Sequence, residues 1–229
     1  MVELFFTILF LILLLLCAIG AVYFFYRAIR LFIIKKIWGG AVRLLLSLLL
    51  GFIVFFVISA VIGAREKALR CSCAGHLGNI VLMLKMYAND HLEAYPSTLN
   101  GLSGDYLKTG DKAILVCPAS HTKAGSLSNI HEWTDFAYVS GLSEADHSGC
   151  VVAFCLPENH KGEGASVAFI GGNVQWYSCN SYTNPSTGER NVTFHDLTNN
   201  PSFFYGTTNL TKLVELMSRT KIIYPKHRK

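Results

Sequence analysis

Charged residues are scarce in this 229-residue chain, where Asp, Glu, Lys and Arg together make up 15%. The shortage is greatest in two runs that contain no charge, Leu4 to Tyr26 and Leu44 to Ala64. As helices, these runs span about 34 and 31 Å, which matches a hydrocarbon core about 30 Å thick. We therefore predict two transmembrane helices, residues 1–26 and 44–64. About 165 residues remain, enough for one water-soluble domain.

A basic front end is also missing, because Glu3 precedes the first apolar run. A cleaved signal peptide is the alternative reading of that run, but such peptides begin with Lys or Arg and have a shorter apolar stretch. The sequence favours a retained helix.

Acidic residues are absent from the connector between the two runs, residues 27–43, which carries five cations: Arg27, Arg30, Lys35, Lys36 and Arg43. Lys and Arg gather in cytoplasmic loops of membrane proteins. We therefore expect this loop to be cytoplasmic and the chain from Arg65 onward to be extracytoplasmic. The five cations equal the net charge of +5, so no nucleic-acid partner is predicted.

Proline is missing between Leu44 and Asp90. A single helix can therefore leave the bilayer and continue into the outer domain. It should end near Asp90 to Glu93, because the residue before Pro96 disfavours helix. Its outer part has apolar residues at helical spacing, at Leu69, Cys73, Leu77, Ile80, Leu84 and Tyr87.

Short apolar runs after Pro96 predict a small antiparallel sheet. The candidate strands are Ala113 to Cys117, Phe136 to Val139, Cys150 to Leu156, and a hairpin from Ala165 to Ser178. Gly171-Gly172-Asn173 suits the turn of that hairpin. The predicted fold class is therefore α+β, with two transmembrane helices of which the second continues as a spine helix packed on the sheet.

We place the extracytoplasmic domain at residues 65–178. Residues 179–229 are richer in Asn, Ser and Thr and are predicted to form a polar C-terminal extension. Within it, Asn209 can cap a short helix from Leu210 to Arg219. Leu210, Leu213, Leu216 and Met217 are expected on the apolar side of that helix.

Six cysteines fall in the predicted outer domain and extension: Cys71, Cys73, Cys117, Cys150, Cys155 and Cys179. In an oxidising compartment they can form up to three disulfides, in fifteen pairings between which the sequence does not choose. We expect at least one disulfide. Cys71 and Cys73 should not pair with each other, because two residues on a helix lie about 200° apart around its axis.

Metal sites are the alternative use of these cysteines, and His147, Cys150, Cys155 and His160 form a run of zinc-ligand types. On a strand, however, Cys150 and Cys155 point to opposite faces. Calcium needs several oxygen ligands, but Glu158 and Glu163 are the only carboxylates between residues 151 and 188. The sequence therefore predicts no metal site.

Enzyme motifs are missing as well. A cysteine hydrolase could be imagined from Cys117 with His121 or His160 and Asp135. No nucleophile elbow, phosphate loop or dinucleotide loop accompanies these residues. We predict no catalytic residue, no cofactor, no small-molecule substrate and no enzymatic activity.

Three blocks of the chain resemble one known family in the same order. Ala64 to Pro96 reads AREKALRCSCAGHLGNIVLMLKMYANDHLEAYP and resembles the segment after the membrane helix of prepilin-like proteins, AREKARR..C..NLKQ…L.MYANDN.G.YP. Val116-Cys117-Pro118 resembles the F-x-CP element of that family. His160-Lys161-Gly162 followed by AFIGGNVQW resembles its C-terminal hairpin, with Phe169, Gly171, Gly172 and Trp176 at motif positions.

The resemblance to prepilins and to the major pseudopilins of type II secretion implies a long spine helix on a small antiparallel sheet. The chain departs from the family at two places. The leader motif Gly-Phe-Thr-Leu-Ile-Glu is absent, and its glutamate falls near Val42. Gly171-Gly172 replaces the Asp-Gly of the hairpin. The resemblance implies that the family's glutamate pairs with the amino terminus made by leader cleavage, and neither partner is expected here, so conventional polymerisation is not expected. Cleavage by prepilin peptidase is not expected either, because neither the Phe nor the glutamate of the motif follows Gly39-Gly40.

The resemblance implies a non-enzymatic structural or assembly protein of the bacterial cell envelope, in a type II secretion or pilus-like system. The two predicted transmembrane helices and the basic connector add to this a multi-pass protein of the bacterial inner membrane with its C-terminal domain extracytoplasmic. The expected partners are the lipid bilayer and other pilin-like or secretion-system proteins. The alternative function is an extracytoplasmic binding or interaction module that uses the pilin fold without polymerising.

Overall fold

The structure is a computed structural model that describes residues 19–30, 37–183 and 189–226. The chain divides into two compact units, residues 1–66 and 67–229. Most of the first predicted transmembrane helix, residues 1–18, lies outside the described residues, while residues 19–30 are helical. A second membrane-spanning helix is therefore not shown. Lys35 and Lys36 of the basic connector also lie outside the described residues.

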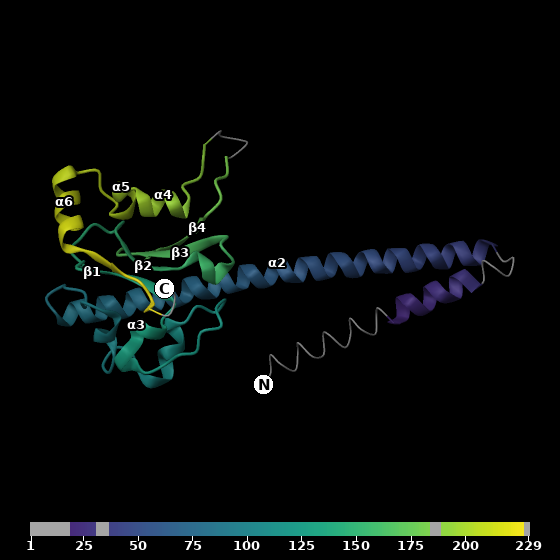
Figure 1. Cartoon of the computed structure of the whole chain (residues 1–229), viewed down its shortest axis with the longest axis horizontal. Coiled ribbons are helices and arrows are strands. Elements are labelled where there is room, and N and C mark those ends of the chain that lie inside the picture. The colour runs from purple at the N-terminus through teal and green to yellow at the C-terminus, as the bar shows by residue number, and fades with distance from the viewer. Residues whose placement is uncertain (1–18, 31–36, 184–188, 227–229) are drawn as a thin grey trace. The chain divides into compact units, whose positions relative to one another are not determined.

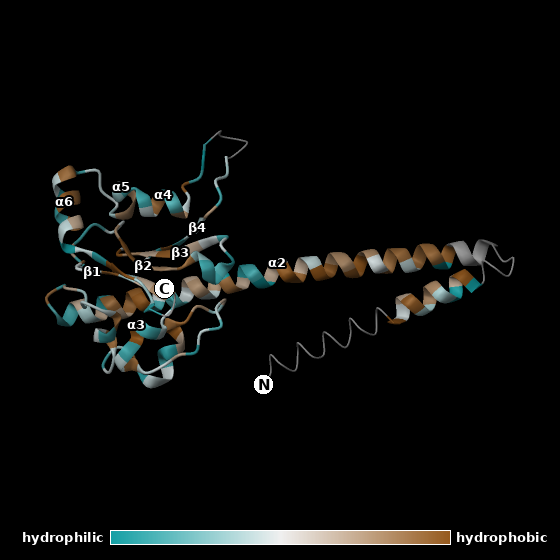
Figure 2. Ribbon diagram, viewed as in Figure 1, coloured by the Kyte–Doolittle hydropathy of each residue, from teal (hydrophilic) through white to brown (hydrophobic). Residues whose placement is uncertain are grey.

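Helix α2 runs over 54 residues from Ile37 to Asp90. It begins inside the predicted loop 27–43, so the end of the basic connector is helical. Within the described residues, 42–90 is the one helix long and apolar enough to cross a membrane. Most apolar side chains of its first part, residues 44–64, are exposed, with Leu45 at 66% and Phe55 at 67%. Figure 2 shows this stretch as hydrophobic along most of its length.

The last part of α2 is packed on one side, as its sequence pattern predicts. Cys73, Leu77, Ile80 and Leu84 are fully buried, and Leu69 and Tyr87 are half-buried. The helix ends at Asp90, where the sequence predicted a stop. The chain then turns back through two residues with positive φ, Leu92 and Glu93, and the Glu93 amide donates to the Ala88 carbonyl at 2.8 Å.

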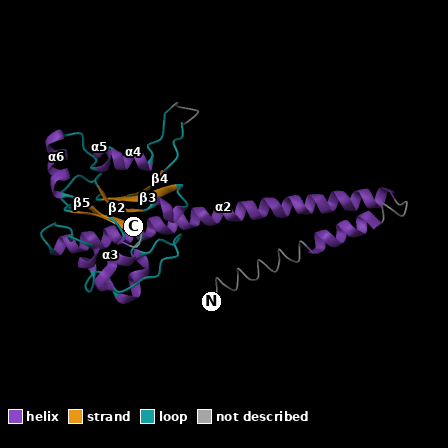
Figure 3. Cartoon of the chain, viewed as in Figure 1, coloured by secondary structure: helices purple, strands orange, loops and turns teal. Residues whose placement is uncertain are grey.

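A five-stranded antiparallel sheet forms the centre of the unit 67–229, in the order β4-β3-β2-β1-β5 (Figures 1 and 3). Its strands are β1 Phe136–Ser140, β2 Val151–Cys155, β3 Gly164–Phe169, β4 Val174–Ser178 and β5 Lys221–Ile223. The structure confirms the predicted strands at Phe136 to Val139 and Cys150 to Leu156, which are β1 and β2. It also confirms the predicted hairpin, which is β3 and β4. Gly172, with φ of +91°, lies in the hairpin turn.

Both faces of the sheet are covered, which explains why every residue of β2 is buried. Side chains alternate along a strand, so neighbouring residues face opposite layers. Phe154 packs against Phe194 of α4, with ring centroids 5.6 Å apart, while Cys155 next to it meets Cys73 of α2. Figure 1 shows the sheet between α4 and residues 67–90 of α2. The prediction of an α+β fold with a helix packed on an antiparallel sheet is confirmed.

The prediction of a strand from Ala113 to Cys117 is wrong. Residues Thr109–Leu115 form a 3₁₀ helix, η2. The Leu115 carbonyl accepts hydrogen bonds from the Asp135 amide and the Thr134 hydroxyl, at 3.2 and 2.9 Å, so this segment is joined to the residues just before β1 and not to a sheet edge. The other short helices between α2 and β1 are η1 Leu99–Leu102, η3 Leu127–Asn129 and α3 Ile130–Trp133, and η4 Pro157–His160 follows β2.

The C-terminal residues pack on the domain to a greater extent than their polar composition suggests. They form α4 Phe194–Asn199, α5 Pro201–Phe204, α6 Leu210–Arg219 and the edge strand β5. The predicted short helix is confirmed as α6, and the Asn209 side chain caps it by accepting from the Lys212 amide. Its predicted apolar side is only partly right, because Leu216 is buried but Leu210 and Met217 are 73% and 51% exposed.

Candidate functional site

Four buried side chains with metal-ligand chemistry meet where the outer part of α2 packs on the sheet: Cys73, Cys117, Cys155 and His160. Their ligand atoms all lie within 4.8 Å of one another. None of the four side chains is more than 1% exposed. We call this group the Cys3His cluster.

Each member of the Cys3His cluster comes from a different local structure. Cys73 lies on the buried stripe of α2, and Cys117 follows η2 and precedes Pro118. Cys155 is the last residue of β2, and His160 is the last residue of η4. The Lys161 backbone, with φ of +58°, ends η4 and turns the chain toward β3.

Hydrogen bonds around the cluster fix the Cys117 segment. The Cys117 amide donates to the buried carboxylate of Asp135 at 2.9 Å. The hydroxyls of Ser120 and Thr122 also donate to that carboxylate, the latter at 2.8 Å. One turn beyond Cys73 on α2, His76 Nδ1 lies 2.9 Å from the Val116 carbonyl oxygen. The cysteine is thereby held from both the sheet side and the helix side.

The cluster atoms also contact one another and one amide outside the group. Cys117 Sγ lies 3.5 Å from His160 Nε2, and the Asn159 side chain donates to Cys155 Sγ at 3.2 Å. Hydrogen bonds from the Cys155 and Cys73 thiols lower the pKa of Cys117 far below its usual value. The hydrogen bond to Cys117 raises the pKa of Cys73, and burial raises that of Cys155.

Aromatic and basic side chains close the cluster on the hairpin side. The rings of His160 and Trp176 meet edge to face with centroids 5.0 Å apart. Arg70 lies over the Trp176 ring, 4.4 Å from its centroid, and forms an ion pair with Glu163. Gly164 permits this packing, since a Cβ there would approach the Trp176 ring to 2.7 Å.

The three other cysteines among the described residues do not join the cluster. Cys71 is exposed, Cys179 is half-buried, and the Cys150 thiol donates to the Tyr205 carbonyl at 3.0 Å. Cys150 and Cys155 thus point to opposite faces, as strand alternation predicts. All six are free thiols in the structure, and a disulfide stays a prediction. Only Cys73, Cys117 and Cys155 lie together.

The predicted hairpin residues divide into two groups. His160 and Trp176 lie at the cluster, while Phe169, Gly171 and Gly172 lie at the end of β3 and in the following turn. The predicted topology cations that the structure describes, Arg27, Arg30 and Arg43, belong to the unit 1–66 and form no part of the site.

The sequence-based search for zinc ligands considered a local run and therefore missed the cluster. Of that run, only Cys155 and His160 meet, and they are completed by Cys73 and Cys117 from distant parts of the chain. A signal was present nonetheless. Cys73, Cys117 and His160 each fall within one of the three blocks that carry the prepilin resemblance.

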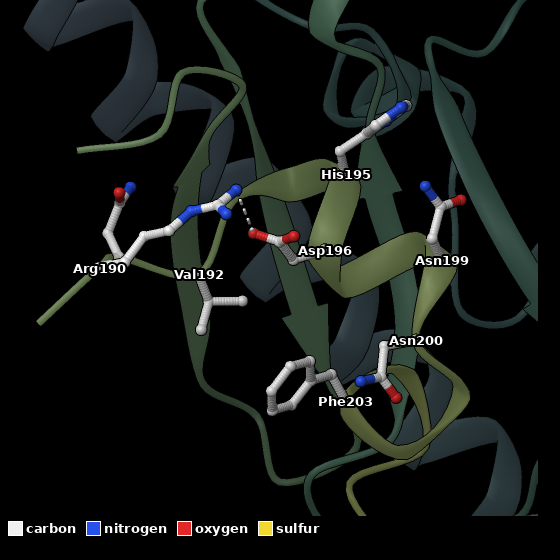
Figure 4. Close-up of a pocket in the computed structure, with 8 residues that line it drawn as sticks. Arg190, Val192, His195, Asp196, Asn199, Asn200 and Phe203 are labelled. Carbon is white, nitrogen blue, oxygen red and sulfur yellow. Dashed lines mark ion pairs between the residues drawn. The ribbon is translucent and has the colours of Figure 1, made fainter. Parts of the chain in front are cut away.

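A surface hollow of about 320 Å³ lies beside α4 (Figure 4). Its acidic group, Asp196, accepts from the Thr193 amide and hydroxyl at 3.0 and 2.8 Å, and Arg190 lies 3.6 Å away. These hydrogen bonds, the one from the Thr193 amide first, lower the pKa of Asp196. His195 points away from Asp196 in Figure 4. The Asp196 carboxylate caps the start of α4 together with Thr193, so the acidic group in the hollow has a structural role.

No family model, characterised protein or solved structure matches this chain.

Proposed function

We propose that the chain is a membrane-anchored, pilin-like structural or assembly protein of the bacterial cell envelope, in a type II secretion or pilus-like system. The observation that carries the proposal is the continuity of α2. The first part of this 54-residue helix has most of its described apolar side chains exposed, and its last part has a single buried stripe that packs on an antiparallel sheet. A helix apolar all round suits lipid, whereas a one-sided stripe suits a domain surface.

The proposed placement is the inner membrane with the unit 67–229 outside the cytoplasm and residues 1–26 as a second anchor. The basic connector supports this orientation, because Lys and Arg near a membrane helix are retained on the cytoplasmic side. Val42 occupies the place of the family's glutamate near the start of the apolar stretch. The protein therefore stays anchored and acts as a partner or organiser of pilin-like proteins, with no catalytic role.

Crosslinking in intact membranes tests the assembly role. A cysteine-independent, amine-reactive crosslinker should produce a ladder of species that contain secretion or pilus proteins. A chain that runs only as a monomer or small oligomer would instead support the second function, a binding module on the same fold. Its apolar exposed face on α6, formed by Leu210, Val214 and Met217, would then be the first surface to mutate.

Reporter fusions test the topology. Because the connector cations should remain inside, alkaline phosphatase fused after Gly125 is expected to be active, and phosphatase fused after Lys36 is expected to be inactive. A cytoplasmic reporter at the same two positions serves as the control and should give the reverse pattern. Activity of phosphatase at Lys36 with none at Gly125 would disprove the proposed orientation.

A further inference from the structure

We propose that Cys73, Cys117, Cys155 and His160 bind one Zn²⁺ ion as a closed structural centre. The ion would be held by three thiolates and one imidazole nitrogen. It would join the spine helix to the loop after η2 and to the β2–η4 connection. This site is independent of the proposed function and follows from the packing of the unit 67–229 alone.

The spacing of the ligand atoms fits one tetrahedral ion. With Zn–S bonds of about 2.3 Å and a Zn–N bond of about 2.1 Å, tetrahedral angles place sulfur about 3.8 Å from sulfur and about 3.6 Å from nitrogen. Cys117 Sγ lies 3.5 Å from His160 Nε2. All six distances among the four ligand atoms are within 4.8 Å, so only a small contraction is needed.

The burial of His160 also supports this side chain as a ligand of the ion. The ring is 1% exposed, its Nδ1 has no hydrogen-bond partner, and the contact recorded for Nε2 is the sulfur of Cys117. A buried polar group without a partner costs free energy. Coordination of the ion by Nδ1 would supply the partner that this nitrogen lacks, whereas coordination by Nε2 would replace the contact with Cys117 Sγ and leave Nδ1 unpaired.

The environment suits a structural ion better than a catalytic one. Four protein ligands complete a tetrahedral shell and leave no position for water or substrate, which is the pattern of structural zinc sites. Three thiolates around Zn²⁺ leave one negative charge, and the Asn159 amide donates to one of the sulfurs at 3.2 Å. Such hydrogen bonds to ligand atoms orient them and spread their charge.

Other uses of these residues fit less well. A disulfide would use two of the three thiols and leave the third buried beside His160, with no explanation of the imidazole. A two-iron cluster shares its four ligands between two metal ions and so needs a wider cage. Sulfur and nitrogen ligands in a compact tetrahedral arrangement select zinc.

Metal analysis of the full-length chain, purified in detergent without chelators, tests the proposal. We expect about one zinc per chain, which single substitutions Cys73→Ser and Cys155→Ser should reduce to less than about a fifth. Cys71→Ser and Cys150→Ser are the matched controls, because the first residue is exposed on the same helix and the second is buried outside the cluster. Both controls should keep the full zinc content.

Two further measurements separate metal binding from general misfolding. His160→Cys supplies a fourth thiolate and should retain zinc, whereas His160→Ala should lose it. Replacement of the metal by Co²⁺ in the unaltered chain should give the visible absorption of a tetrahedral thiolate site. Less than about a tenth of a zinc per chain after expression in zinc-rich medium, iron or copper in its place, or a disulfide between cluster cysteines would overturn the proposal.

Discussion

Replacement of Leu77 by Ala is expected to lower the free energy of unfolding of the outer domain by about 2–5 kcal/mol. Leu77 is fully buried on the stripe of α2 and belongs to the core that the helix shares with the sheet. Its truncation removes apolar contact and leaves a cavity, because the sheet residues opposite cannot collapse fully onto a helix fixed at both ends of the stripe.

Leu82→Ala is the matched control on the same helix. Leu82 is 58% exposed, so its truncation should change the free energy of unfolding by no more than about 0.5 kcal/mol. Thermal unfolding followed by circular dichroism in detergent measures both variants. Equal losses of stability would show that α2 is not packed on the sheet through the predicted stripe.

The sequence predicted the parts of the fold that depend on local patterns. The end of α2 follows from Tyr95-Pro96, and the buried stripe follows from the helical spacing of Cys73, Leu77 and Ile80. The hairpin follows from two apolar runs around Gly171-Gly172, where the second glycine has positive φ. In each case the physical cause lies within a few residues of the element, so no knowledge of distant contacts is needed.

The errors arose where distant contacts decide the structure. The run AILVC at 113–117 is apolar enough for a strand, but Leu115 is bonded to Thr134 and Asp135 instead. Strand β5 has only three residues, Lys221–Ile223, and exists because β1 offers it a free edge. Neither result can be read from a short window, since the deciding partner lies elsewhere in the chain.

The Cys3His cluster shows the same limit at the level of the site. A search by spacing finds zinc ligands that lie close together in sequence, as in short metal-binding motifs. Here the fold brings Cys73 to Cys155 across the contact between helix and sheet. Strand alternation did exclude Cys150 as a partner of Cys155, but it could not supply the replacement ligands, which depend on the packing of α2.

Replacement of Asp135 by Ala is expected to have the second large effect, a loss of about 3 kcal/mol or more in the free energy of unfolding. The Asp135 side chain is fully buried, and its carboxylate accepts from the Cys117 amide and from the hydroxyls of Ser120 and Thr122. Alanine would leave the Cys117 amide and the Thr122 hydroxyl without this acceptor, whereas the Ser120 hydroxyl could still donate to the Cys117 carbonyl, 2.9 Å away. Buried donors that lose a partner cost more than a surface hydrogen bond contributes, because water cannot replace the acceptor at the Cys117 amide.

Asp111→Ala, on η2 in the same segment, is the matched control, because Asp111 is exposed and should tolerate the change. Asp135→Asn gives a graded comparison. Its amide oxygen can still accept from the Cys117 amide, but its NH2 group would face the Thr122 hydroxyl and the negative charge is lost, so an intermediate loss of stability is expected. Urea unfolding measures the free energy of unfolding of the three variants. The loss should be largest for Asp135→Ala, intermediate for Asp135→Asn and smallest for Asp111→Ala. The same samples report on the cluster, since Asp135 positions the Cys117 backbone and its loss should also lower the zinc content. A stability equal to that of Asp111→Ala would show that the carboxylate does not hold the Cys117 segment.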